Sequence, residues 1–208
     1  MEPFRQLEGI AAPMVIDNVD TDQIIPSREM KRVSKTGLGQ GLFAGWRYTY
    51  DGSKKTGDNP DFVLNRAEYQ NASILLSGRN FGCGSSREHA VWALKDYGFR
   101  VVIAESFGRI FRSNCGRNGL LAIVLPVAAI AALEEQTRID PQNRRVLVDL
   151  EARELRGPDG STFTFDIPES DRHMLLNGLD YIDFTLGFEA NINRFVAADR
   201  DARPWAHL

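Results

Sequence analysis

The segment Ser77–Ala90 holds the densest group of chemically useful residues in the chain. Its three glycines permit a tight turn, and Ser85 and Glu88 have the spacing of a capping box, which predicts that a helix begins there. The N-terminus of a helix presents free amides and about half a positive charge, so it stabilises an anion or a developing alkoxide. Ser85, Ser86 and Arg87 therefore surround a predicted anion site, in which Arg87 could bind a carboxylate through two parallel hydrogen bonds.

Two familiar motifs fit this segment poorly. A dinucleotide-binding loop needs a third glycine where the chain has Arg87, and a serine-hydrolase elbow needs a glycine two residues after its serine, which neither Ser85 nor Ser86 has. A nucleophilic pair of Cys83 and His89 stays open, since a thiol near a helix N-terminus can be acidified. A purely structural role, with Ser85 as a cap and Cys83 as a small filler, also stays open.

The regions around this segment alternate between strand-like and helix-like apolar patterns. This order predicts a parallel sheet covered by helices, and Gly98 is expected to end the first of those helices. Strands are expected at Ala72–Ser77, Arg100–Ala104 and Leu120–Leu125, and helices at Ser86–Tyr97, Gly108–Asn114 and Val127–Glu135.

The N-terminal third combines one strand with long irregular stretches. Ile10–Ile16 predicts a strand that leads into Asp17–Gln23, whose three aspartates favour turns. The glycine-rich residues 27–60 show little periodicity, so we expect a long functional loop there.

The C-terminal third predicts a different arrangement. Gly157–Gly160 has the composition of a hairpin turn, flanked by strands at Val146–Leu150 and Ser161–Phe165. Helices are expected at Glu169–Leu176 and Ile182–Val196, followed by an exposed charged tail. We expect the whole chain, 1–208, to form a single domain.

The composition limits the possible partners and the compartment. With 208 residues, 43% hydrophobic, and a net charge of -3, the chain is typical of a globular protein without an electrostatic footprint for nucleic acid. Cys83 and Cys115 lack metal-ligand spacing, and the three histidines are isolated, so no metal site is expected in this chain. Two separated thiols and a charged N-terminal stretch predict a cytoplasmic protein that does not bind a membrane.

Three segments together resemble the aconitase superfamily, and within it the family of 3-isopropylmalate dehydratase small subunits: Asp20–Pro26, Gly78–Ala90 and Phe111–Leu121. The resemblance extends over essentially the whole chain. It implies a three-layer β/β/α swivelling domain that closes over a separate large subunit carrying a four-iron four-sulfur cluster, with no cofactor in this chain. It also implies that Ser85 is a general base, that Ser86 and Arg87 bind substrate, and that Asp22 is an acid at the edge of the site.

The implied reaction is that of a hydro-lyase of leucine biosynthesis, which interconverts 2-isopropylmalate and 3-isopropylmalate through isopropylmaleate. A related hydro-lyase for citramalate or homocitrate would use the same catalytic residues, and a noncatalytic dicarboxylate-binding domain is a third possibility. Asp17 and Asp20 are expected to form turns, and Cys115 to belong to the core. Three basic residues could either contact substrate or form a solvated face: Arg28, Lys31 and Arg32.

Overall fold

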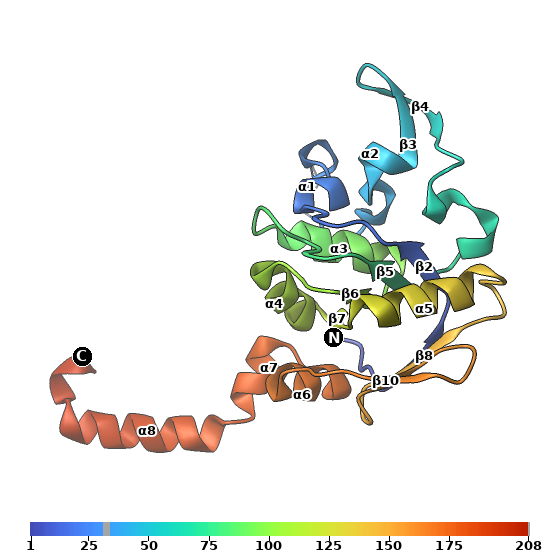
Figure 1. The fold of residues 1–208 in the computed structure, drawn as a ribbon. Coiled ribbons are helices and arrows are strands. Elements are labelled where there is room, and N and C mark those ends of the chain that lie inside the picture. Colours follow the sequence, from blue (N-terminus) through green and yellow to red (C-terminus); the bar gives the residue numbers. More distant parts are fainter. Residues whose placement is uncertain (31–33, 208) are drawn as a thin grey trace.

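A parallel sheet lies at the centre of the protein, whose computed structural model describes residues 1–30 and 34–207 (Figure 1). Its strands are ordered β2-β5-β6-β7, so each pair of neighbours runs in the same direction. Ile74 pairs with Ala11 on one side and with Val101 on the other. The strands are β2 (Ala11–Met14), β5 (Ile74–Ser77), β6 (Val101–Ala104) and β7 (Leu121–Val124).

The helices that follow these strands bury apolar residues against the sheet. Helices α3 (Glu88–Tyr97) and α4 (Arg109–Asn118) connect β5 to β6 and β6 to β7, and α5 (Val127–Arg138) follows β7. Because successive strand residues point to opposite faces, Leu75 packs in the cluster that contains α3, whereas Ile74 packs in the cluster that contains α5. The alternation expected from the sequence is confirmed, and Gly98 ends α3 as expected.

A second, antiparallel sheet forms another layer, in the order β1-β8-β9-β10. Its buried residues Val146, Val148 and Leu155 share a core cluster with α5 and with one face of the parallel sheet. The antiparallel sheet, the parallel sheet and the α3–α4 layer give the expected three-layer β/β/α fold. The strands of this second sheet are β1 (Gln6–Gly9), β8 (Val146–Asp149), β9 (Glu154–Arg156) and β10 (Thr162–Thr164).

The expected hairpin turn joins a different pair of strands. The turn at Gly157–Gly160 joins β9 to β10, whereas β8 pairs with β1 and β9. The prediction that this turn joins Val146–Leu150 to Ser161–Phe165 was therefore wrong. A separate tight turn, in which Arg153 adopts a φ of 58°, inserts the short strand β9 between the two segments.

Residues 27–60 contain more regular structure than a loop. They include α2 (Ala44–Arg47) and a hairpin of β3 (Tyr48–Asp51) and β4 (Lys54–Asp58). Buried Leu42 and Phe43 anchor this segment to the core.

Short 3-10 turns lie at Ser27–Glu29, Gly39–Gly41, Val63–Asn65, Ala67–Tyr69 and Pro204–Ala206.

The C-terminal region leaves the body of the protein (Figure 1). Helix α6 (Glu169–Asn177) contacts α4, but α7 (Tyr181–Leu186) and α8 (Glu189–Ala202) contain no buried residue. The single helix expected at Ile182–Val196 is thus divided in two around Gly187. Within the described residues, no helix has the length and apolar character needed to cross a membrane.

Candidate active site

Two loops lie side by side at the carboxyl ends of neighbouring parallel strands. The acidic loop, residues 17–23, follows β2, and the site loop, residues 78–87, follows β5. Backbone hydrogen bonds join them: Asn18 N donates to Arg79 O at 2.7 Å, and Gly82 N donates to Val19 O at 2.7 Å. The carboxyl end of a parallel sheet is the usual place for a ligand site in α/β proteins. The two sequence motifs therefore share one edge of the fold.

Glycine is required where the site loop turns beside α4. Gly82 has a φ of +71°, and a Cβ there would lie 2.2 Å from the ring of Phe111. Phe111 packs edge-to-face on Phe81, with ring centroids 5.4 Å apart. The aromatic pair and the positive φ together fix the path of the loop.

A short helix, α1 (Thr21–Ile24), positions Asp22. Its N-cap is Asp20, whose Oδ1 accepts a hydrogen bond from Gln23 N at 2.7 Å, while Gln23 Oε1 accepts one from Asp20 N at 2.8 Å. This capping box gives Asp20 a structural role, as expected, and leaves Asp22 in the first helical turn. The carboxylate of Asp22 is half-exposed toward the site loop.

Asp22, Ser27 and Arg87 form one hydrogen-bonded cluster. Arg87 Nη1 donates to Asp22 Oδ1 and, at 3.0 Å, to Ser27 Oγ, while Ser27 Oγ donates to Asp22 Oδ1 at 3.2 Å. The Arg87 side chain is only 25% exposed. Its Nε and Nη2 have no hydrogen-bond partner among residues 1–30 and 34–207. A planar edge of the guanidinium can therefore bind a carboxylate.

Ser85 does not cap α3. The helix begins at Glu88, its N-cap is Arg87, and no side chain caps it. Glu88 Oε1 instead accepts a hydrogen bond from Asn118 Nδ2 of α4 at 2.6 Å, and Thr21 Oγ1 donates to Ser85 O at 3.0 Å. The predicted capping box was wrong, because tertiary contacts to α4 and α1 replace the local cap.

The Ser85 and Ser86 side chains are exposed at the rim of the site. Arg87 N donates to Ser85 O at 2.8 Å, which turns the backbone between the serine and the arginine. The structure thus brings Ser85, Ser86, Arg87 and Asp22 to the same edge of the sheet.

The two cysteines have separate environments. Cys83 Sγ donates to Asn18 O at 3.5 Å, whereas His89 packs on Trp92 with ring centroids 4.7 Å apart, so the geometry gives no support to a Cys83–His89 pair. Cys115 is fully buried in the core, as expected, and burial raises the pKa of its thiol well above the usual range. In the described parts of the chain, no three His, Cys, Asp or Glu side chains are grouped to hold a metal. The cysteine, histidine and acidic side chains of the described residues are therefore not arranged to bind an iron–sulfur cluster.

The sequence interpretation missed Ser27 and Thr21, which hold Arg87 and Ser85 in place. Thr21 lies inside the Asp20–Pro26 segment and Ser27 directly follows it, and that proximity was the available signal. The guanidinium of Arg28 stacks over the Tyr50 ring at 4.6 Å and pairs with Glu29 at 3.2 Å. Lys31 and Arg32 lie outside the described residues.

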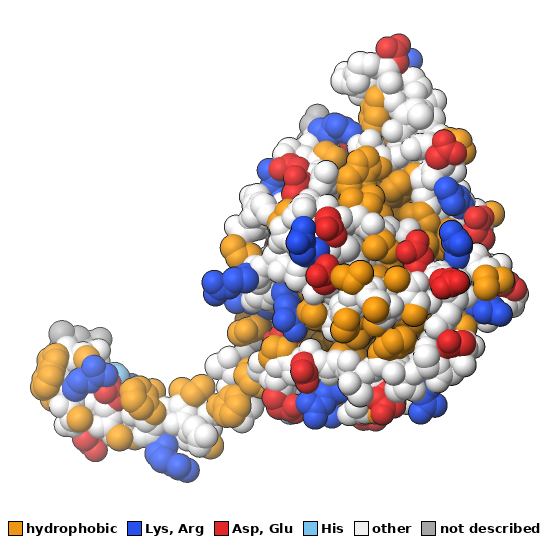
Figure 2. Space-filling view, viewed as in Figure 1, with side chains coloured by type: hydrophobic (Ala, Val, Ile, Leu, Met, Phe, Trp, Pro, Cys, Tyr) orange, Lys and Arg blue, Asp and Glu red, His pale blue; other side chains and the backbone are white. Residues whose placement is uncertain are grey.

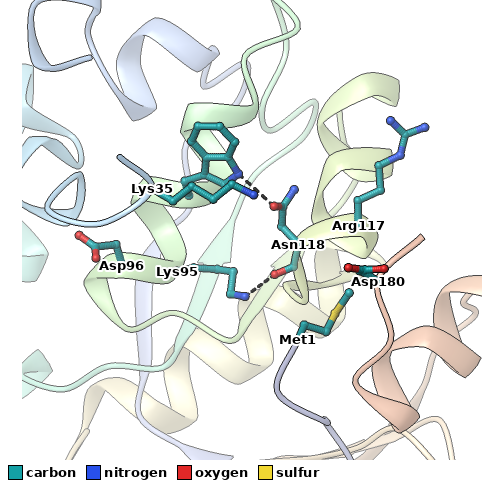
Figure 3. Close-up of a pocket in the computed structure, with 8 residues that line it drawn as sticks. Met1, Lys35, Lys95, Asp96, Arg117, Asn118 and Asp180 are labelled. Carbon is teal, nitrogen blue, oxygen red and sulfur yellow. Dashed lines mark hydrogen bonds between the residues drawn. The ribbon is translucent and has the colours of Figure 1, made fainter. Parts of the chain in front are cut away.

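A cavity of about 400 Å³ lies away from this cluster, between the C-terminal halves of α3 and α4 (Figure 3). Its lining does not include Ser85, Arg87 or Asp22. Lys95 Nζ and Trp92 Nε1 both donate to Asn118 there. The residues that line it are Met1, Lys35, Trp92, Lys95, Asp96, Arg117, Asn118 and Asp180.

Comparison with known proteins identifies the family. The aconitase C-terminal domain family matches residues 1–128. A 3-isopropylmalate dehydratase small subunit from Cupriavidus necator is 55% identical and covers 100% of this chain and 99% of its own length. The chain belongs to the family of 3-isopropylmalate dehydratase small subunits, within the aconitase C-terminal domain family. The family expected from the sequence is confirmed.

Other members of the 3-isopropylmalate dehydratase small-subunit family extend this likeness. The small subunit from Agrobacterium fabrum is 52% identical over 99% of this chain and 100% of its own length. A crystal structure of 3-isopropylmalate dehydratase from Methanocaldococcus jannaschii superposes with a TM-score of 0.64 and 26% identity, over 91% of this chain and 98% of that one. The fold expected from the resemblance is therefore confirmed as well.

Proposed function

We propose that this chain is the small subunit of a two-component hydro-lyase that interconverts 2-isopropylmalate and 3-isopropylmalate through isopropylmaleate, in leucine biosynthesis. The likeness to full-length small subunits at 52% and 55% identity supports the proposal. The geometric observation that carries it is the Asp22–Ser27–Arg87 cluster beside the exposed Ser85. This arrangement offers a carboxylate-binding edge and a hydroxyl on one loop.

In this proposal Arg87 holds a substrate carboxylate through the edge that Asp22 and Ser27 leave free. Ser85, as the alkoxide, removes a proton from the CH₂ carbon next to that carboxylate. The electron pair forms the carbon–carbon double bond, and hydroxide leaves the neighbouring carbon. Water then adds with the opposite orientation: the Ser85 hydroxyl returns its proton to the carbon that lost hydroxide, and hydroxide adds to the carbon that lost the proton, which regenerates the alkoxide.

Serine is a weak base, so its alkoxide must be stabilised before the reaction. Ser85 lies three residues before the first residue of α3 and two before Arg87, which place positive charge nearby. Because Ser85 does not cap the helix, this stabilisation is weaker than a direct hydrogen bond from a helical amide. The proposal therefore requires a further contribution from the partner subunit.

The relatives are named small subunits, which implies a large-subunit partner. We propose that the four-iron four-sulfur cluster belongs to that partner, because Cys83 and Cys115 lie in a loop and in the core and are not grouped with other ligands. We place the complex in the cytoplasm, as the thiols and charge pattern suggest.

The proposal can be tested by mixing this chain anaerobically with the large subunit that belongs to the Cupriavidus necator enzyme. We expect interconversion of the two isopropylmalates only in the mixture, with kcat/KM for 2-isopropylmalate above that for citramalate and homocitrate. A preference for either of the other acids would instead assign the chain to a related hydro-lyase.

A noncatalytic dicarboxylate-binding role makes a different prediction. Calorimetric titration of the isolated chain with 2-isopropylmalate should show weak binding, because only one wall of the site is present. Tight binding by the isolated chain, with no turnover in the mixture, would favour the noncatalytic role.

A further inference from the structure

The C-terminal arm, residues 180–207, extends away from the body of the protein (Figure 1). It consists of α7, α8 and a final 3-10 turn, and neither α7 nor α8 has a buried residue. Asp199 closes its far end by accepting hydrogen bonds from Arg203 at 2.6 Å and pairing with His207 at 2.6 Å. The arm is therefore built as a defined element without a core of its own.

One face of the arm is apolar. Phe188, Ile192 and Phe195 follow one another at helical spacing of four and three residues, and they are 49%, 41% and 65% exposed. Figure 2 shows hydrophobic side chains gathered along this part of the molecule. An isolated helix of 14 residues is marginally stable in water. A second surface that covered the stripe formed by Phe188, Ile192 and Phe195 would therefore stabilise the helix.

Helix α4 links the base of the arm to the active site. At its start, Gly108 N donates to Phe81 O of the site loop at 2.9 Å, and near its end the Arg117 guanidinium stacks over the Tyr181 ring at 5.0 Å. Arg117 and Asp180, the first residue of the arm, both line the cavity drawn in Figure 3. Ten helical residues span about 15 Å, so the contact with Tyr181 lies about one helix length along α4 from the contact with the site loop.

The face of α4 between the site loop and the arm also carries an exposed apolar residue. Ile110, 55% exposed, lies seven residues before Arg117 and so on the same face of α4. In Figure 1 the site loop and the arm project toward the same side of the body. A protein that covered the site loop from this side would therefore also meet the arm.

We propose that the C-terminal arm is a docking element that holds the large subunit over the site loop, with the Phe188–Ile192–Phe195 stripe seated in an apolar groove of that subunit. This inference rests on the proposed function, in which the large subunit completes the site. The relatives that match the full chain, arm included, are named small subunits.

The test combines Ile192→Glu and Phe195→Glu in one full-length chain, the stripe variant. This variant is mixed with the large subunit of the Cupriavidus necator enzyme. The matched control, Ala190→Glu with Ala197→Glu, adds the same charge to the opposite side of α8. We expect the stripe variant to raise the dissociation constant of the complex at least 100-fold by analytical ultracentrifugation, and the control to change it less than threefold. The melting temperature of the isolated chain should not change, since these side chains contact no core.

Two results would overturn the docking role. One is unchanged affinity in the stripe variant. The other is a wild-type chain that is dimeric by itself and becomes monomeric in the stripe variant, which would assign the stripe to a second copy. Turnover separates this failure from failure of the proposed function, because an excess of large subunit should restore kcat in the stripe variant, whereas inactivity of the wild-type mixture would contradict the proposed function itself.

Discussion

Arg87 illustrates how single residues prepare the site before a ligand arrives. Asp22 and Ser27 both bind its Nη1, so the plane of the guanidinium is fixed while Nε and Nη2 face away from these partners. Fixing a side chain in advance lowers the entropy cost of binding. Asp22 and Ser27 are thus positioning residues, and Arg87 is the group proposed to touch the substrate.

Arg87→Lys should impair the reaction although it keeps the charge. Lysine cannot form two parallel hydrogen bonds to one carboxylate, and the loss of one charge-assisted bond of about 1.5–3 kcal/mol corresponds to a fall in kcat/KM of roughly 10- to 100-fold. Steady-state kinetics of the reconstituted complex provide the measurement. Arg66→Lys, at an exposed residue whose guanidinium binds Asp61 O, is the matched control. Wild-type kinetics in Arg87→Lys would mean that Arg87 supplies only diffuse charge.

At the scale of elements, the site loop depends on the close packing of Gly82 on Phe111. Gly82→Ala adds a Cβ 2.2 Å from the Phe111 ring and also forces alanine into a φ of +71°. Gly160→Ala is the matched control, because its φ is +88° but nothing lies within 4 Å of the added Cβ. We expect the control to cost about 1 kcal/mol, and Gly82→Ala to cost at least about 2 kcal/mol more through overpacking. Equal free energies of unfolding in urea would show that Phe111 does not restrict the loop.

The turn after β8 makes stability depend on pH. Asp149 Oδ1 accepts a hydrogen bond from Ala152 N at 2.9 Å and Oδ2 accepts one from Gln6 at 2.6 Å, and these bonds lower the pKa of Asp149. A lowered folded-state pKa stabilises the protein above the unfolded pKa of about 3.9, and this contribution is lost as pH falls through the folded value.

Asp149→Ala should therefore cost about 1 kcal/mol at pH 7. The difference from wild type should narrow below about pH 4, where the carboxylate of the unfolded chain becomes protonated. Urea unfolding at pH 7 and at pH 3 measures both values. A difference that stays constant between these pH values would rule out the carboxylate as its source.

The elements differ in how well the sequence predicts them. Strong apolar periodicity identified β5, α3, β6 and β7, because their buried faces repeat over several residues. The capping of α3 was not predictable, since Glu88 is bound by Asn118, thirty residues later in the chain. Likewise, Asp22 and Arg87 could be selected separately by type and motif, but their contact depends on the parallel pairing of β2 with β5.

At the scale of the whole molecule, the structural and functional parts occupy different regions. Two core clusters on opposite faces of the parallel sheet hold the three layers together, while the acidic loop and the site loop meet at one edge of that sheet. The arm, which carries the exposed residues Phe188, Ile192 and Phe195, extends toward the same side (Figure 1). In the proposed function, this arrangement presents one wall of a site to the large subunit.

We propose that this chain supplies the proton-transferring group of a site shared by two subunits. The most direct measurement is the incorporation of solvent deuterium into the CH₂ carbon of 2-isopropylmalate by the complex containing Ser85→Ala, followed by NMR alongside turnover. Ser53→Ala, at an exposed serine in the β3–β4 hairpin, is the control. We predict that exchange and turnover both fall at least ~100-fold, with complex formation and melting temperature unchanged because the Ser85 side chain is exposed. Near-normal exchange in a folded Ser85→Ala complex would contradict the account.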